Sequence, residues 1–100
     1  MVKHIILWKL DEKLSESEKE QVKNNAKREL EALVGLVPGL LSMNIEIGRL
    51  ETSNADIMLE SSFDSFEALK GYKDHPEHVR VANDYVRPYT VQRLCLDFNA

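Results

Sequence analysis

Three histidines and one tyrosine are the residues of this chain best suited to acid–base chemistry. His4 lies in the first apolar run, whereas Tyr72, His75 and His78 lie together in one seven-residue stretch. Histidine is the side chain whose ordinary pKa falls within the physiological range, so such a group could bind a ligand, sense pH or move protons. The chain therefore has a candidate polar site, provided that its fold brings the two segments together.

Each candidate has a catalytic and a structural interpretation. His78 suits a general base, and Tyr72 could donate a hydrogen bond to a carbonyl or enolate oxygen. The structural alternatives are a buried histidine that ties a helix to the sheet and a tyrosine whose ring belongs to the core. His4 has the same two interpretations. His75 precedes Pro76, and we expect it to cap the helix that follows.

Other site chemistries find less support in the sequence. A metal site built from Asp74, His75, Glu77 and His78 is disfavoured, because Pro76 places His75 outside the helix and no distant third ligand is evident. The serines lack the strand-to-helix elbow of a hydrolase nucleophile, and the 4 glycines form no phosphate-binding loop. We therefore expect neither a metal nor another cofactor.

Composition limits the possible compartments and partners. A chain of 100 residues, 43% hydrophobic and 30% charged, suits one domain over residues 1–100. The net charge of −4 argues against nucleic acid as a partner. No apolar run approaches the length of a membrane span or a signal peptide, and Cys95 is the only cysteine. We expect a cytoplasmic protein in which Cys95 is a buried structural thiol.

Hydrophobic periodicity predicts the order strand, helix, strand, strand, helix, strand. Alternation of apolar and polar residues indicates strands over residues 2–10, 41–47, 56–63 and 93–98. Ser15 and Glu18 form a capping box for a first helix of about five turns, at about 3.6 residues a turn, that stops near Gly35. Asp64 or Ser65 opens the second helix, which breaks near Pro76 and restarts.

This order predicts an α+β, ferredoxin-like split βαβ fold, a four-stranded antiparallel sheet with helices on one face. The other face presents Ile5 and Leu7, joined by Met58 and Cys95. An uncovered apolar face marks an interface, and two such sheets meeting face to face would form a homodimeric α/β barrel.

The pocket is expected between the sheet and the broken second helix, where a small molecule would bind. His4 shares a strand face with Ile6 and Trp8, so it should point toward the helices and approach His78. The proposed lining also includes Tyr72, with His75 near it and the apolar side chains Leu59, Phe63, Phe66 and Leu94 as walls.

Several segments together resemble the stress-responsive dimeric α/β-barrel (Dabb) family. They are residues 2–9 (VKHIILWK), 38–40 (PGL), 62–65 (SFDS) and 72–78 (YKDHPEH), in that order along the chain. The resemblance spans essentially the whole sequence. It implies a homodimer whose two sheets form a barrel.

The resemblance also implies roles for three residues. Plant members of the olivetolic acid cyclase type cyclise a linear polyketide thioester without a metal. Their catalytic tyrosine and histidine match Tyr72 and His78, and the histidine of their first strand matches His4. Their first-helix aromatic residues are replaced here by Val22, Lys23 and Ala26, so the long alkyl-tail pocket is not carried over. Two functions stay open: a small-molecule-binding protein capable of acid–base chemistry on a carbonyl or polyketide-like compound, and a non-enzymatic stress-response or structural dimer.

Overall fold

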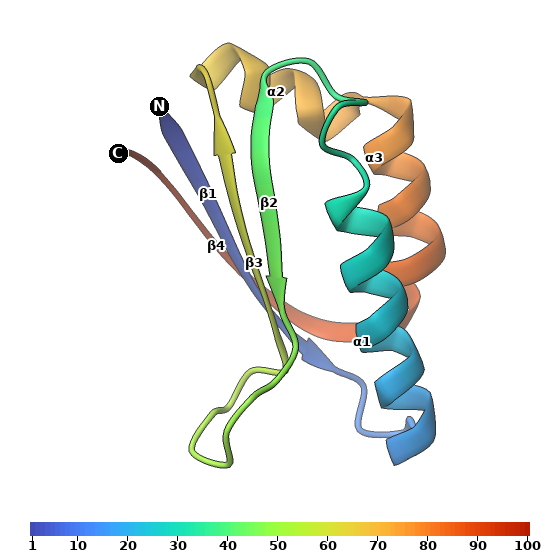
Figure 1. Ribbon diagram of the computed structural model, residues 1–100. Coiled ribbons are helices and arrows are strands. Elements are labelled where there is room, and N and C mark those ends of the chain that lie inside the picture. Colours follow the sequence, from blue (N-terminus) through green and yellow to red (C-terminus); the bar gives the residue numbers. More distant parts are fainter.

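The computed structural model describes all 100 residues. A single antiparallel sheet forms one of its two layers (Figure 1). Its strands are β1 (Val2–Leu10), β2 (Leu40–Glu46), β3 (Ile57–Phe63) and β4 (Thr90–Asn99), in the spatial order β2-β3-β1-β4. The two ends of the chain lie side by side, and the Ala100 amide donates to the Met1 carbonyl oxygen at 3.0 Å. The predicted ferredoxin-like fold is confirmed.

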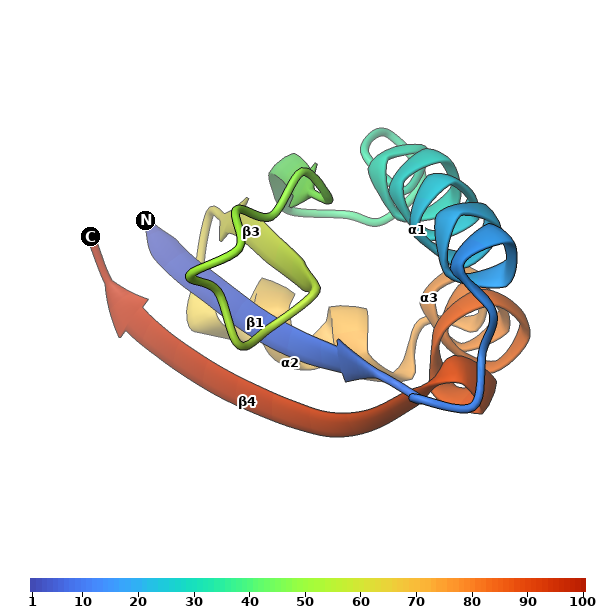
Figure 2. The ribbon, with the colours of Figure 1, turned by 90° about the horizontal axis from the view of Figure 1, so that it is seen from below.

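The helices form the second layer. They are α1 (Glu16–Glu31), α2 (Phe66–Asp74) and α3 (Pro76–Val81), followed by a π-helical turn (Ala82–Val86) and a 3₁₀ turn (Arg87–Tyr89) that lead into β4. Figure 2 shows α1 and α3 side by side, on the same side of the sheet. The capping box of Ser15 and Glu18 is present, and Ser65 is the N-cap of α2.

The first helix ends earlier than predicted. Its last residue is Glu31, and the chain then makes turns through Gly35, whose φ of 93° only glycine adopts without strain. Leu33 and Val37 stay buried within these turns. The apolar spacing therefore continues past the helix, which explains why periodicity alone made the helix too long.

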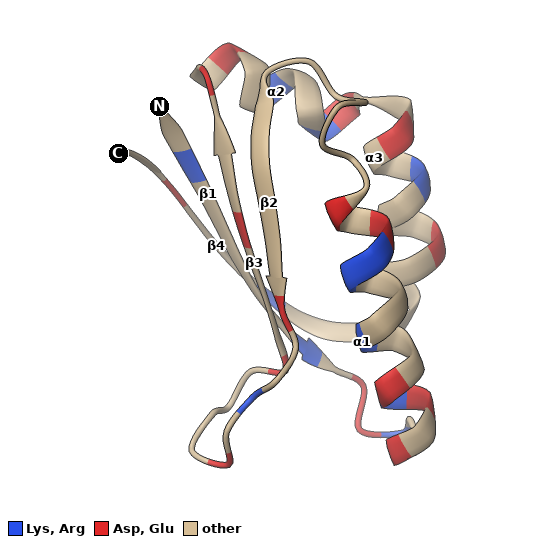
Figure 3. Ribbon diagram, in the orientation of Figure 1, with Lys and Arg blue, Asp and Glu red and all other residues tan.

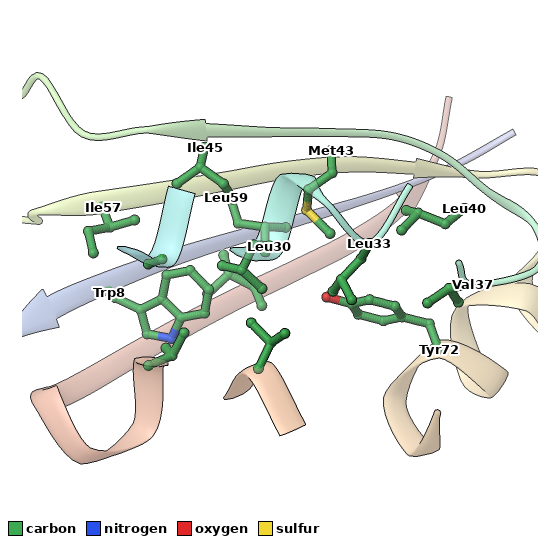
Figure 4. Packing of buried hydrophobic residues seen from close by; sticks show 14 of the residues in the cluster. Trp8, Leu30, Leu33, Val37, Leu40, Met43, Ile45, Ile57, Leu59 and Tyr72 are labelled. Atoms are coloured by element: carbon green, nitrogen blue, oxygen red, sulfur yellow. The ribbon is translucent and has the colours of Figure 1, made fainter. Parts of the chain in front are cut away.

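The hydrophobic core lies between the two layers (Figure 4). Alternate residues of β1 point into it, from Val2 through His4, Ile6 and Trp8 to Leu10, as the alternation predicts. From the opposite side come the buried residues of α1, namely Val22, Ala26 and Leu30. His4 is thus a polar side chain placed at a core position.

The other face of the sheet carries no helix, and β4 supplies much of its apolar surface. Leu94 pairs with Leu7, and Leu96 pairs with Ile5, so all four side chains share this face. Leu94 and Leu96 are 60% and 64% exposed. The sequence pattern predicted the opposite orientation of β4, with Leu94 facing the helices in the pocket wall and Cys95 on this uncovered face. The apolar side of an edge strand was wrongly assigned to the core.

Charged residues hold α1 against the sheet as well as covering its outer surface. Figure 3 shows acidic and basic residues interspersed along α1. The Lys27 ammonium donates to the Ile45 carbonyl at 2.8 Å, and the Glu31 carboxylate accepts from the Ile45 amide at 3.0 Å. Both bonds fix the helix to β2.

None of the helices combines the length and the apolar character that crossing a membrane requires.

Candidate functional site

A cavity of about 470 Å³ opens between the sheet and the helices. Most of the predicted pocket residues line it, namely His4, Ile6, Trp8, Leu59, Tyr72 and His78. The rest of its wall comes from Leu30, Lys73, Asp74, Ala82, Val86, Arg87, Thr90 and Arg93. Its size and its mixture of apolar walls with a few polar groups are typical of small-molecule sites. A second hollow, of about 370 Å³ beside the 48–55 loop, contains none of the candidate site residues.

The break between α2 and α3 brings Tyr72 and His78 together. His75 is the N-cap of α3: its backbone is extended (φ −65°, ψ 132°) and its Nδ1 accepts from the Glu77 amide at 3.1 Å. Pro76 follows as the first residue of α3, where its missing N–H costs nothing. The Tyr72 and His78 rings consequently lie 4.1 Å apart between centroids, with planes inclined by 32°. His75 caps α3 and does not line the cavity.

His78 is held in one tautomer. Its Nδ1 lies 3.1 Å from the Lys73 carbonyl oxygen, which can only accept a hydrogen bond, so Nδ1 carries the proton and Nε2 keeps its lone pair. Burial lowers the pKa of His78, and the nearby charges of Arg87 and Arg93 lower it further against the opposing effect of the Lys73 bond. The ring is therefore neutral at neutral pH and can accept a proton at Nε2.

Tyr72 presents a free hydroxyl to the same cavity. The residue is only 2% exposed, and its hydroxyl makes no hydrogen bond within the protein. Every fully buried side-chain nitrogen or oxygen atom of the protein does have a hydrogen-bond partner, so this hydroxyl is not one of them. The hydroxyl must therefore border open space in the cavity; Figure 4 shows it pointing away from α2, into the layer between sheet and helices. Burial raises the pKa of Tyr72, so the hydroxyl stays protonated and acts as a donor.

His4 is bound to a carboxylate from the neighbouring strand. Its Nδ1 donates to Asp97 Oδ1, and its ring packs edge-on against Tyr72 with the centroids 6.1 Å apart. Burial, together with the charges of Arg93 and Lys73, lowers the pKa of His4 more than Asp97 raises it. For Asp97, burial raises the pKa, but the bonds from His4 and Cys95 and the nearby positive charge of Lys73 together lower it by more. The pair is thus a neutral imidazole that donates to an ionised carboxylate.

The only group of side chains able to share a metal ion is not the one weighed from the sequence. Asp74, His75, Glu77 and His78 form no such group, whereas ligand atoms of His4, Cys95 and Asp97 lie within 4.8 Å of one another. Burial and the Asp97 charge raise the pKa of Cys95, which is exposed rather than buried as predicted. A protonated thiol beside a hydrogen-bonded His4–Asp97 pair is poorly prepared to bind a metal.

Three predicted wall residues lie outside the cavity. Phe63 is fully buried behind it, edge-on to Tyr72 with the centroids 5.1 Å apart. Phe66 is 55% exposed, because it begins α2 and its ring faces outward beneath the Lys70 ammonium. Leu94 is on the opposite face of the sheet, as described above. Phe63 therefore supports Tyr72, and the other two have no contact with the site.

The sequence did not predict the charged residues of the site. Lys73, Arg87 and Arg93 line the cavity, and Asp97 binds His4. Arg93 and Asp97 alternate with the apolar Leu94 and Leu96. Once the apolar side of β4 is given to the uncovered face of the sheet, its polar side must face the helices. That alternation was the signal that could have revealed Arg93 and Asp97.

Comparisons with known proteins agree on the fold. The model of the stress responsive A/B barrel domain matches residues 2–100. A dimeric protein of unknown function with a ferredoxin-like fold from Bacteroides fragilis NCTC 9343 is 30% identical; the match covers 99% of this chain and 95% of that one, with a TM-score of 0.93. No curated protein matches the chain.

More distant solved structures share the architecture at lower identity. A Dabb-family protein from Mesorhizobium loti is 18% identical over 99% of this chain and 95% of that one, with a TM-score of 0.75. A hydroxynitrile lyase from Passiflora edulis is 16% identical over 97% of this chain and 90% of that one, with a TM-score of 0.72. At such identities the likeness concerns the fold, which by itself does not determine an activity.

Proposed function

Because the chain belongs to the stress responsive A/B barrel domain family, we propose that it is a homodimer that binds a small carbonyl compound and performs acid–base chemistry on it. The observation that carries this proposal is the pairing of Tyr72 and His78 in one cavity. His78 keeps a free lone pair on Nε2, and Tyr72 keeps a hydroxyl proton that it can donate. Both groups lie beside apolar walls.

The two groups have complementary roles toward a carbonyl compound. Tyr72 donates its hydroxyl proton in a hydrogen bond to the carbonyl oxygen, while His78 Nε2 removes a proton from the adjacent carbon. The negative charge that develops on the oxygen is stabilised by the tyrosine, and the protonated His78 later returns its proton. His4 acts through position, since its edge-on contact with Tyr72 and its bond to Asp97 hold the tyrosine ring in place.

The cavity walls fit a compact apolar body. Ile6, Trp8 and Leu59 line the side formed by the sheet. Such walls accept an aromatic ring or a short alkyl chain, and they exclude water from the developing charge. A carbonyl compound with a second carbonyl group could also cyclise there, since the carbanion produced by His78 can attack that second group.

The homodimer rests on the uncovered face of the sheet. Leu7, Leu94, Leu96 and Phe98 are all exposed there, although apolar side chains of this size are normally buried. The Bacteroides fragilis protein, 30% identical to this chain, is described as dimeric. Two copies packed through this face would bury the apolar surface and leave both cavities accessible on the outer side.

A specific observation favours a non-enzymatic alternative. Nδ1 of His4 and of His78 already bonds to protein, one to Asp97 and the other to the Lys73 carbonyl. Both histidines could therefore be structural, in a stress-response or structural dimer that performs no reaction. The two functions differ in what happens at the free Nε2 atoms.

A ligand screen with matched variants separates the two functions. Wild type, Tyr72→Phe, His78→Asn and His75→Asn are heated with a library of small carbonyl compounds. An asparagine at 78 can still donate to the Lys73 carbonyl but has no basic nitrogen. Asparagine at 75 can still cap α3 and lies outside the cavity. A ligand at about 100 times its Kd stabilises the fold by about 2.7 kcal/mol, which is easily seen.

The catalytic proposal predicts that a compound found this way exchanges its α-protons in D₂O faster with wild type than with His78→Asn. It also predicts that His75→Asn behaves as wild type. If compounds bind but wild type and His78→Asn exchange protons at equal rates, His78 is no base. If no carbonyl compound stabilises wild type, the non-enzymatic function stands.

A further inference from the structure

We propose that the ligand of this cavity carries an anionic group, a carboxylate or a phosphate, held at the cavity mouth by Lys73, Arg87 and Arg93. This inference rests on the proposed function and names the substrate class of the same site. The ligand would be an oxo acid: an apolar body with a carbonyl group near Tyr72 and an anion near the basic residues.

The arginines of the chain divide into two groups by their partners. Arg28, Arg49 and Arg80 each lie within salt-bridge distance of at least one carboxylate. Arg87 and Arg93 have no carboxylate partner; Arg87 Nη1 donates only to the neutral amide oxygen of Asn83, at 2.6 Å. Both of the unpaired arginines line the cavity. Their lack of partners is specific to this site.

The charge balance of the cavity is opposite to that of the whole chain. The protein has 17 acidic and 13 basic residues, so carboxylates are available in excess. Lys73, Arg87 and Arg93 nevertheless all line the cavity, with Asp74 as the only carboxylate among the lining residues. Both site histidines are neutral, so the lining has a surplus of positive charge. A surplus of this kind attracts an anionic ligand.

Arg93 also connects the basic mouth to the reacting groups. Burial is the main influence on the pKa of Tyr72 and of His78, and the charge of Arg93 lowers both. Arg93 faces Trp8 in the register of β4 and β1, whereas His4 lies on the same side of β1 four residues away. A ligand that bonds to Arg93 and to Tyr72 would thus lie along the floor formed by β1.

The guanidinium group suits the role that this geometry assigns to it. Its planar donors match two oxygens of a carboxylate or phosphate, and such charge-assisted bonds are about twice as strong as neutral ones. Lys73 lies next to Tyr72 in the chain and can add a third positive charge from α2. Three positively charged residues from separate elements would fix one end of the ligand and so orient its carbonyl group.

The test compares three ligands that differ only in their polar end. They are 4-oxo-4-phenylbutanoate, its neutral amide and the phosphonate of equal chain length. Their Kd values are measured by calorimetry with the purified full-length chain, at low and high salt. The variants are Arg87→Met and Arg93→Met, with Arg80→Met as the matched control, because Arg80 loses the same charge outside the cavity.

We expect at least one anion to bind wild type about tenfold more tightly than the amide, and added salt to reduce that advantage. Arg93→Met and Arg87→Met should each remove most of it, while Arg80→Met leaves it unchanged. The stronger of the two anions identifies the group as carboxylate or phosphate. Equal affinity of acid, phosphonate and amide for wild type would overturn the inference, as would an equal loss in Arg80→Met.

The same data distinguish this failure from failure of the proposed function. Adding His78→Asn and Tyr72→Phe shows whether the aryl ketone binds in the cavity at all. If all three ligands bind equally and depend on Tyr72, the cavity takes neutral carbonyl compounds, and only the anionic group is wrong. If none binds wild type, both the anionic group and the proposed function are wrong for ketones of this size.

Discussion

The rings of Tyr72 and His78 lie 4.1 Å apart between centroids, with their planes tilted by 32°, although they belong to different helices. On one continuous helix a spacing of six residues places two side chains about 120° apart around the axis, since each residue turns the helix by about 100°. The extended backbone of His75 removes that separation. The contact is therefore a consequence of the break in the helix, and the chemistry of the site depends on it.

The protonation of His78 can be measured directly. Because burial lowers its pKa below the ordinary value of 6.5, an NMR titration of the ring should give a midpoint below that value. The nitrogen shifts should report a proton on Nδ1, as the bond to the Lys73 carbonyl requires. A midpoint at or above 6.5, or a proton on Nε2, would contradict the proposed base.

The same shift predicts how stability changes with pH. The unfolded chain binds a proton at His78 near pH 6.5, whereas the folded protein resists it, so the free energy of unfolding falls as the pH drops from 6.5 to the lowered pKa. Denaturant titrations at several pH values should show this loss in wild type and a smaller loss in His78→Asn. His4 contributes in the same direction and accounts for the loss that persists in the variant.

Tyr72→Phe should separate function from stability. The hydroxyl makes no bond to protein, so its removal should change the free energy of unfolding by less than about 0.5 kcal/mol. Ser61→Ala is the comparison, because the Ser61 hydroxyl is buried and donates to the His4 carbonyl at 3.2 Å. That substitution should cost about 1 kcal/mol. A large loss in Tyr72→Phe would indicate that the tyrosine hydroxyl is structural.

Two glycines with positive φ provide a test of how closely α2 packs on the sheet. Gly39 (φ 81°) precedes β2, and a Cβ there would collide with Ala68 Cβ and lie 2.9 Å from Asp64 Oδ1. Gly35 (φ 93°) has no atom within 4 Å of the same position. Gly35→Ala should therefore cost about 1 kcal/mol, from backbone strain alone. Gly39→Ala should cost about 3 kcal/mol or more in urea denaturation, because overpacking adds to that strain.

The oligomeric state depends on the uncovered sheet face. Leu96→Lys places a charge in its centre, so sedimentation at micromolar concentration should change from twice the chain mass of 11.5 kDa to the chain mass itself. Leu50→Lys is the control, because Leu50 is 75% exposed on the loop between β2 and β3 and makes no part of this face. A wild-type monomer would remove the homodimer from the proposed function.

Sequence patterns predicted the parts of the molecule that depend on short-range rules. Alternation assigned the faces of β1 and β3 correctly, and Ser15 and Pro76 marked helix starts where the structure has them. The orientation of β4 could not be obtained this way. An edge strand with one apolar and one polar side can pair with its neighbour either way round, and its register with β1 decides which side faces the helices.

The sequence did not predict the site residues Arg87, Arg93 and Asp97 for a related reason. Arg87 follows a π-helical turn, where the spacing of the α-helix no longer tells which side chains share a face. Arg93 lines the cavity and Asp97 bonds to His4 only through the register that sets them beside Trp8 and His4, from the far end of the chain. Contacts between strands so distant in sequence follow from the assembled sheet, not from any local pattern.

The break at His75 has a further consequence for how related chains can vary. Between Tyr72 and His78 the side chains of Asp74 and Glu77 can change as long as Lys73, the cap and the proline are preserved, but the number of residues cannot. Insertion or deletion of one residue in α3 before His78 would turn its ring by about 100° about the helix axis and carry it away from Tyr72. Related chains that keep the paired rings should therefore have this segment at the same length, even where its residues differ. Chains that keep only the fold should vary in its length.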